Sequence, residues 1–305
     1  MPTASTTVGD YLLIVVERCI DGIEAAEPLV RHRRSSAAVD GVHDMRVSVR
    51  RLRAAFKIFR GVVPRELRKT FADEARWLGH ALASARDWDV FIGETLPRLA
   101  RSLEQATQRE PIERTAARKR QVAYRIARAA LDDPRYRAIK ESFGDRLRDQ
   151  LIALEPPHGG GALNAQVRSY AAQFLRKRGR KLRATASDIT RLDVDALHEL
   201  RLKIKELRYA MQFFRPIYGS ERATRYLDAL RDLQDALGAI NDARVAAELV
   251  VEALRDARPP LDPARSAGIQ ASIERWRQRR VKKQMARLPK LWRRFRDQKL
   301  NWIDR

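Results

Sequence analysis

Apolar residues along this chain recur at alternating steps of three and four, the spacing that keeps side chains on one face of an α-helix. We find no stretch of four or more residues that alternates cleanly between polar positions and positions rich in Val, Ile or Thr. The pattern therefore predicts an all-α fold. The expected helices span residues 8–33, 41–60, 65–84, 88–109, 112–131, 135–153, 164–186, 196–215, 220–238, 242–257, 264–287 and 290–302.

Proline and glycine punctuate this helical pattern and predict where the helices end. Breaks are expected at 61–64, Pro111, Pro134, 155–161, 216–219, 259–263 and Pro289. The segment 155–161, EPPHGGG, is the densest of these and marks the predicted boundary between two units, 1–155 and 162–305. Each unit has enough long helices for a bundle of at least four.

The two units contain the same pattern, 155 residues apart. HDMRVSVRRLRAAFKIFR begins at His43 and HELRLKIKELRYAMQFFR at His198. At the same offset, LGHALASARDWDV begins at Leu78 and LQDALGAINDARV at Leu233. We interpret the chain as a tandem duplication. It predicts two helical bundles related by a pseudo-twofold axis.

Each copy carries an apolar seam and, one residue later, a row of cations, here called the basic ridge. The seams are Val42, Met45, Val49, Leu52, Phe56, Phe59 and Val63, and Leu197, Leu200, Ile204, Leu207, Met211, Phe214 and Tyr218. The ridges are His43, Arg46, Arg50, Arg53, Lys57 and Arg60, and His198, Arg201, Lys205, Arg208, Gln212 and Arg215. A shift of one residue rotates the ridge by roughly 100° from the seam. The seam is expected to be core, with the ridge at its border.

The ridge admits two interpretations. Charges at helical spacing usually form a solvated face, and the acids at neighbouring positions, Asp44, Glu199 and Glu206, are typical of one. The ridge itself contains no acid in either copy, so its cations repel one another unless an anion lies between them. From His43 to Lys57 a helix rises on the order of 21 Å, which favours an extended anion. We expect the two ridges to face each other across a central basic channel.

Asp40 and Asp195 correspond in the two copies and are expected N-caps, which would place His43 and His198 in a first helical turn. Backbone N–H groups converge there and suit a phosphate, while the helix dipole lowers the pKa of an imidazole. The alternative is that each histidine fills a polar niche at a bundle end. No metal site is expected, because no ligand cluster of recognisable spacing surrounds either histidine.

The second repeated block also contains matching acids, Asp87 and Asp242. Either residue could cap the following helix or hold a ridge arginine in place. Arg86, beside Asp87, is replaced by Asn241 in the second copy, so the repeat does not assign Arg86 to the site.

Charge and cysteine content narrow the setting. Lys and Arg number 62 against 39 Asp and Glu, so the net charge of +23 predicts a polyanionic partner. Arginine supplies 50 of the 62 cations; phosphate recognition favours arginine, but a GC-rich genome produces the same excess. Cys19 is the one cysteine and the N-terminus lacks both a signal sequence and a membrane span. A cytoplasmic protein is expected.

The repeated histidine helices and the LASARDWDV and LGAINDARV blocks resemble the CHAD family, the conserved histidine α-helical domain, from about Val8 to Trp302. The resemblance implies two bundles around a basic channel that binds inorganic polyphosphate, without catalysis or cofactor. It also implies association with polyphosphate or polyhydroxyalkanoate granules. The implied binding residues are His43, Arg46, Arg50, Arg53, Lys57, His198, Arg201, Lys205, Arg208 and Gln212. Gln212 and Asn241 depart from a strictly symmetric site.

Three rival functions remain. The phosphates of a nucleic acid would bind the same cations. However, the ridges lack interleaved aromatic residues, and no helix-turn-helix or zinc-finger signature is present. The basic stretch 275–299 could lie on an anionic membrane or granule surface through Trp276, Leu288, Leu291, Trp292 and Phe295, or it could close a bundle. An enzyme is not expected, since the glycine run at 159–161 lacks the Lys-Ser/Thr of a phosphate-binding loop.

Overall fold

The computed structural model describes residues 5–32, 35–100, 106–154, 161–186, 188–298, 300 and 303. Within this part of the chain every regular element is helical, which confirms the all-α prediction. The helices are α1 (Val8–Arg31), α2 (Ser35–Ile58), α3 (Arg65–Ala81), α4 (Ala83–Val90), α5 (Leu96–Ala100), α6 (Ala106–Asp132), α7 (Pro134–Ala153), α8 (Val167–Arg183), α9 (Val194–Tyr218), α10 (Glu221–Arg255) and α11 (Pro263–Arg296). A π-helical turn, Phe91–Thr95, joins α4 to α5.

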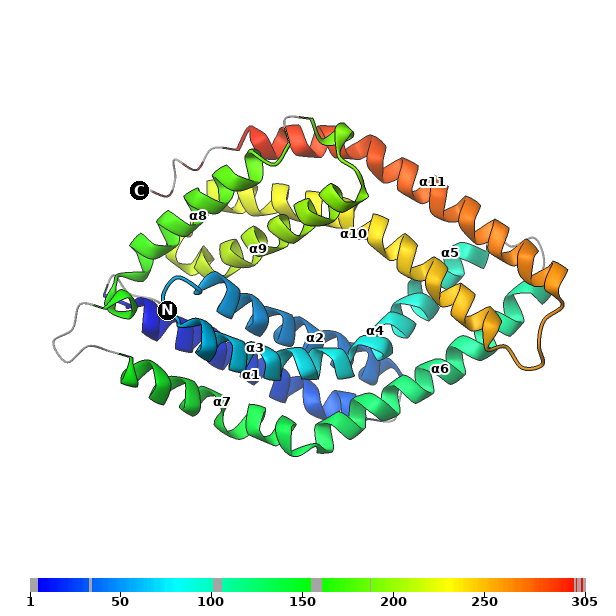
Figure 1. The fold of residues 1–305 in the computed structure, drawn as a ribbon, viewed down its shortest axis with the longest axis horizontal. Coiled ribbons are helices and arrows are strands. Elements are labelled where there is room, and N and C mark those ends of the chain that lie inside the picture. Colours follow the sequence, from blue (N-terminus) through cyan, green and yellow to red (C-terminus); the bar gives the residue numbers. More distant parts are fainter. Residues whose placement is uncertain are drawn as a thin grey trace.

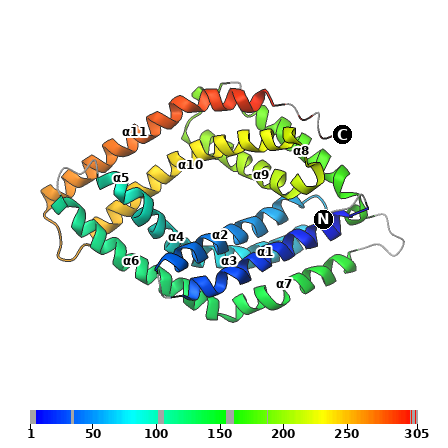
Figure 2. The same ribbon diagram turned by 180° about the vertical axis from the view of Figure 1, so that it is seen from behind.

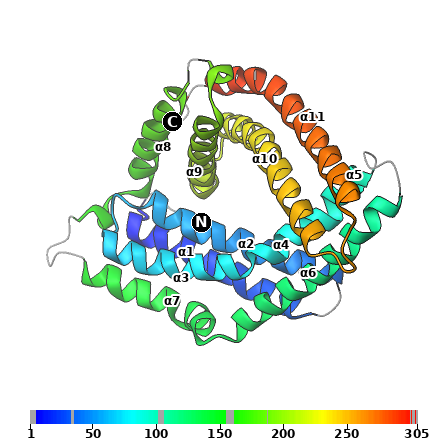
Figure 3. The same ribbon diagram turned by 45° about the vertical axis from the view of Figure 1, so that its right-hand side comes forward.

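The helices form two arcs, α1 to α7 and α8 to α11 (Figure 1). The arcs meet near the chain start and again at the opposite end, where α6 lies beside α10 and α11; the reverse view agrees (Figure 2). Figure 3 shows α9 and α10 as the inner helices of the second arc, turned toward α2 and α4. Helices α9 and α10 carry the second copy of the repeated motif, and α2, the end of α3 and α4 carry the first.

At the first meeting point the arcs share an apolar core. The ring of Phe59 stacks on Tyr170, with centroids 5.6 Å apart, and meets Phe214 edge-on at 6.0 Å. The backbone N–H of Val8 donates to the carbonyl of Ala165 at 2.9 Å, which ties the start of α1 to the segment before α8. The halves therefore pack as one hydrophobic core at this end.

At the second meeting point the arcs are joined by charge. Lys119 of α6 forms ion pairs with Glu252, at 2.8 Å, and with Asp256 at the end of α10. The guanidinium of Arg118 donates to the backbone carbonyl of Asp256. Contacts at both ends hold α2 opposite α9 and α10.

The predicted seams are core. The first copy is at most 3% exposed throughout, and the second is at most 6% exposed from Leu200 onward, with Leu197 half-buried. Each ridge follows its seam by one residue and therefore borders the buried face. The seam prediction is confirmed.

Several predicted helix ends are wrong. Helices expected at 220–238 and 242–257 form the single helix α10, and those at 264–287 and 290–302 merge into α11, which runs through Pro289. Pro111 and Pro216 likewise lie inside α6 and α9. Tertiary packing outweighs the breaker in α11, because Leu288 and Trp292 on either side of Pro289 are buried. The breaks at 61–64, Pro134 and 259–263 are confirmed, while 155–160 lies outside the described residues.

Candidate functional site

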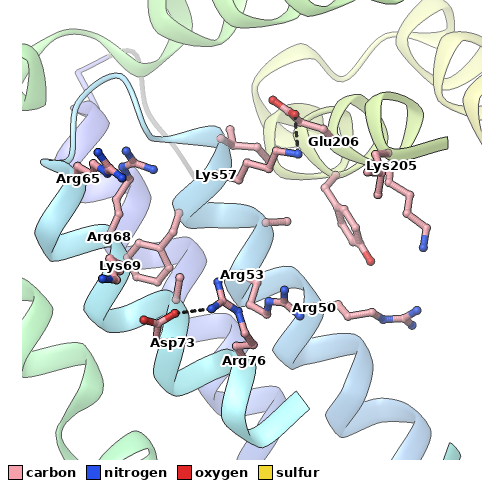
Figure 4. Close-up of a pocket in the computed structure, with 16 residues that line it drawn as sticks. Arg50, Arg53, Lys57, Arg65, Arg68, Lys69, Asp73, Arg76, Lys205 and Glu206 are labelled. Carbon is pink, nitrogen blue, oxygen red and sulfur yellow. Dashed lines mark ion pairs between the residues drawn. The ribbon is translucent and has the colours of Figure 1, made fainter. Parts of the chain in front are cut away.

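The ridges border two cavities between the arcs, here called the α3 cavity and the α10 cavity. The α3 cavity has a volume of about 590 Å³ and opens between α2, α3 and α9. Its charged lining is Arg50, Arg53, Lys57, Arg65, Arg68, Lys69, Arg76 and Lys205, with the acids Asp73 and Glu206. Figure 4 shows the α3 cations on one side and Lys205 of α9 on the other. Eight cations thus surround the space with two acids.

The α10 cavity has a volume of about 610 Å³ and lies between α2, α4, α9 and α10. Its charged or titratable lining is His43, Arg46, Arg50, Arg86, Asp87, Glu94, Arg201, Lys205, Asp235 and Asp242. Glu94 and Thr95 come from the π-helical turn, whose extra residue per turn redirects side chains toward the cavity. Five Lys or Arg residues here face four acids.

Arg50 and Lys205 line both cavities, so the two spaces adjoin at this pair. Burial, together with the positive charges of Arg201 and Arg50, lowers the pKa of Lys205 to about 8. The ammonium group is therefore held among like charges that an anion would compensate. The pair comes from different copies of the repeat.

Arg46 presents an unsatisfied donor in the α10 cavity. Its Nη1 is buried and has no hydrogen-bond partner in the described part of the chain. Burial lowers the pKa of this guanidinium, and Asp87 only partly offsets that loss. A buried donor without an acceptor costs roughly 1–3 kcal/mol, more for a charged group, so this site favours an added acceptor.

Glu206 was expected on a solvated face, and this expectation is wrong. Its side chain is 8% exposed, and its carboxylate forms ion pairs with three cations: Lys57 at 3.1 Å, Arg60 at 3.2 Å and Arg178 at 2.9 Å. Figure 4 shows the contact with Lys57 across the space between α2 and α9. The first ridge is therefore not acid-free in three dimensions, because the second copy supplies an acid at its C-terminal end.

The expected capping of the histidines is also wrong. Helix α2 begins at Ser35, so Asp40 lies inside the helix. His43 lies about two turns after the helix start. The N-cap of α9 is Asp193, whose carboxylate accepts from the backbone N–H of Ala196 at 2.8 Å. Burial, followed by the charge of Arg86, lowers the pKa of His43. The helix dipole is not needed to explain that direction.

Three of the ten predicted binding residues line neither cavity: His198, Arg208 and Gln212. His198 is exposed near the start of α9. The Nε of Arg208 donates to Oε1 of Gln234 at 2.6 Å, and its guanidinium lies 4.8 Å from the Tyr209 ring centre. The other seven predicted residues line one or both cavities.

Asp87 and Asp242 cap no helix, since each lies inside one. Burial raises the pKa of both carboxyls, and Asp242 raises that of Asp87 further. Arg46 opposes the shift at Asp87, as Arg201 does at Asp242. Each acid thus has a ridge arginine from its own copy of the repeat as an electrostatic partner.

Sequence reasoning missed the cations that α3 contributes, Arg65, Arg68, Lys69 and Arg76. Their spacing keeps them near one face of a helix, which was a usable signal. These four residues lie between the two repeated blocks, so the repeat does not single them out.

The basic stretch 275–299 falls on α11, apart from its end. Leu288, Trp292 and Phe295 are at most 3% exposed and pack into the core, which favours the bundle-closing alternative for this helix. Among the described residues no group of three His, Cys, Asp or Glu could hold a metal ion. In the same part of the chain, no helix combines the length and apolar content needed to cross a membrane.

Comparison with known proteins agrees with the fold. The CHAD domain family matches residues 14–251. The crystal structure of the CHAD domain from the plant Ricinus communis is 27% identical and superposes with a TM-score of 0.72, over 95% of this chain and 91% of that one. PptA from Streptomyces chartreusis is 19% identical with a TM-score of 0.66, over 94% and 100%, a likeness in fold. Among curated proteins no match is found.

Proposed function

The chain belongs to the CHAD domain family, and on that premise we propose that it binds inorganic polyphosphate, without catalysis, between its two arcs. One observation carries the proposal. Ridge cations 155 residues apart in sequence line two adjoining cavities and meet at Arg50 and Lys205. In this proposal the two halves are pseudo-twofold-related bundles, and the cavities are parts of one basic channel.

The length and charge of the lining support a linear polyanion. From Arg46 to Lys57, α2 rises roughly 16 Å, longer than a single phosphate group can contact. Charge-assisted hydrogen bonds from arginine to phosphate oxygens are short and strong, and Arg46 has a buried donor to offer. We propose Arg46, Arg50, Arg53, Lys57, Arg201 and Lys205 as direct ligands, with His43 at the edge of the channel.

Nucleic acid is the main competitor, since both ligands are phosphate polyanions. A duplex needs a broad convex or flat surface, whereas these cations line cavities between helices of the two arcs. Granule association would follow from binding: a protein that grips polyphosphate is carried to wherever the polymer accumulates.

The direct test is a competition experiment with the purified protein. We expect long-chain polyphosphate to displace labelled duplex DNA, and unlabelled DNA to displace labelled polyphosphate poorly. Affinity for polyphosphate should fall steeply with added salt, as counterion release requires. Tighter binding of DNA, or an affinity independent of salt, would contradict the proposal.

A matched pair of variants locates the binding surface. Replacing Arg50, Arg53 and Lys205 with Ala should lower polyphosphate affinity by about 100-fold or more, since each charge-assisted contact contributes roughly 1.5–3 kcal/mol. The control replaces three exposed cations outside both cavities, Arg137, Lys177 and Lys181, with Ala. Helicity and thermal unfolding are measured for both. Equal losses would mean that net charge, not the cavities, drives binding.

A further inference from the structure

The first turns of α3 carry cations where a helix least favours them. Arg65, Arg68 and Lys69 fall within the first five residues of α3 and line the α3 cavity. The positive end of the helix dipole lies at this terminus, so these three cations are unfavourable there, and Glu66 is the one acid that the first turn sets against them. Pro64 precedes the helix and provides no side-chain cap.

The corresponding start of α10 has a side-chain cap. Its first five residues also include Arg222 and Arg225, but Arg225 pairs with Glu221 at 2.9 Å and neither arginine lines the α3 cavity. At the 155-residue offset Arg65, Arg68 and Lys69 become Ser220, Ala223 and Thr224. Ser220 caps α10 by accepting from the backbone N–H of Ala223 at 3.1 Å. The duplication therefore explains the ridges but not the α3 cations, which belong to the first half alone.

Two of these cations have no hydrogen-bond or ion-pair partner among the described residues. Arg65 and Lys69 are exposed and form no hydrogen bond or ion pair with any residue that the structure describes, while Arg68 donates from Nε to the carbonyl of Val63 at 3.1 Å. In Figure 4 the ends of Arg65 and Arg68 lie beside each other, away from the ion pair of Asp73 with Arg76. Repulsion between these neighbours adds to the cost of the helix start.

We propose that Arg65, Arg68 and Lys69 form a second arm of the anion site, at the α3 side of the α3 cavity, which binds a further stretch of the same linear polyphosphate beyond the Arg50–Lys205 pair. The inference rests on the proposed function. From Arg65 to Arg76, α3 extends roughly 16 Å along one wall of the cavity that Arg50 and Lys205 also line, so a ligand that follows this wall from the arm toward the pair has to be a chain of several phosphates. The site is then one-sided and selects for chain length.

The test compares tripolyphosphate, which is too short to cover both regions, with long-chain polyphosphate by calorimetric titration. The arm variant carries Arg65→Ser, Arg68→Ala and Lys69→Thr, the residues of the second copy. We expect its affinity for the long chain to fall by about tenfold or more and its salt dependence to become shallower, because fewer counterions are displaced. Tripolyphosphate affinity should change by less than about twofold, because one contact region is retained.

Two controls separate the outcomes. The Arg137, Lys177 and Lys181 triple Ala variant removes the same charge elsewhere and should keep long-chain affinity within about threefold, as distant charges are screened. Loss of long-chain affinity no greater than in this control, or an equal loss for tripolyphosphate, would overturn the arm. If the wild-type protein binds neither ligand, the proposed function itself fails.

A second readout distinguishes a binding role from a structural one. The double variant Arg65→Ser, Lys69→Thr leaves the contact of Arg68 with Val63 in place. Without polyphosphate we expect its melting temperature to rise by about 3 °C, since unfavourable charges leave the helix start. A lower melting temperature would mean that these cations hold the fold together, against the proposal.

Discussion

The α3 cavity and the α10 cavity share Arg50 and Lys205 and have nearly equal volumes, yet their charges differ. The α3 cavity has eight Lys or Arg residues against two acids, and the α10 cavity five against four. The cavity with the highest positive charge is therefore not the cavity that holds His43 and the matching acids Asp87 and Asp242. Affinity should come mainly from the α3 cavity, while the balanced α10 cavity should respond most to small changes in charge.

The largest effect on polyphosphate affinity is expected from two double variants, each of which removes two cations from one cavity. Arg46→Gln with Arg201→Gln leaves the α10 cavity with more acids than Lys or Arg, whereas Arg53→Gln with Arg76→Gln leaves the α3 cavity strongly positive. We expect about a 100-fold loss of polyphosphate affinity for the first pair and about tenfold for the second, because lost contacts are joined by repulsion only in the first.

Calorimetric titration of both double variants checks the order of these losses. The conservative variant Arg46→Lys with Arg201→Lys serves as a control, because it keeps charge and should recover much of the affinity. Equal losses from the two cavities would remove the proposed difference between them.

The next effect concerns pH and the shared Lys205. Its folded pKa of about 8 lies below the ordinary value of 10.5, so bound anion should restore its proton. Polyphosphate affinity should fall by about tenfold between pH 7.5 and 9.5, as one proton is taken up on binding. Lys205→Arg should flatten the profile, because arginine keeps its charge.

The same shift affects stability without ligand. A lysine whose folded pKa is lowered destabilises the fold below that pKa, and the cost disappears as pH rises from about 8 toward 10.5. Chemical denaturation of the wild type against Lys205→Met over this range should show the relief in the wild type alone. Parallel profiles would contradict the assigned environment.

A smaller effect is expected from the acids of the α10 cavity. Asp87→Asn with Asp242→Asn removes two negative charges beside Arg46 and Arg201. Polyphosphate affinity should rise by about fivefold, since screened repulsion at these distances is modest. Asp145→Asn with Asp149→Asn, on exposed positions of α7, is the matched control. A decrease would mean that the acids position the arginines more than they repel the ligand.

The smallest change in binding accompanies a large change in stability. Glu206→Gln leaves Lys57, Arg60 and Arg178 without their shared carboxylate, which should lower the free energy of unfolding by about 3 kcal/mol. Polyphosphate affinity should rise by about twofold as Lys57 is freed for the α3 cavity. Chemical denaturation measures the change in stability, and titration measures the change in affinity. An unchanged free energy of unfolding would mean that the ion pairs of Glu206 do not stabilise the packing of the two arcs.

Helix type, seams and ridges could be predicted because they are periodic properties of single helices. Val42 and Leu200 lie in the core because they are on the apolar face of their helices, whereas Arg46 and Arg201 are on the neighbouring basic face. The helix ends were less predictable, since packing between helices decides them. Gly41 is an example, because a helix was expected to begin there but α2 begins at Ser35. A Cβ at this position would lie 2.6 Å from the Cβ of Leu29, so the glycine lies inside α2 and permits its close contact with α1.

The site was predictable only as far as the repeat extended. Seven of the ten expected residues line the cavities, because the repeated sequence pattern falls on the helices that border them. Glu206 could not be assigned from its own helix, as its partners lie on α2 and α8. The α3 cations escaped prediction for the opposite reason, since they have no equivalents in the second copy.

The carboxylate of Glu206 has a consequence for the ancestry of the chain. In the first copy the corresponding position, 155 residues earlier, is Arg51. A protein assembled from two first halves would place a cation where Lys57 and Arg60 require an acid, and one made of two second halves would lack Lys57, since Gln212 stands there. On the proposed duplication, the two copies are complementary at this contact, and neither half could replace the other in a homodimer.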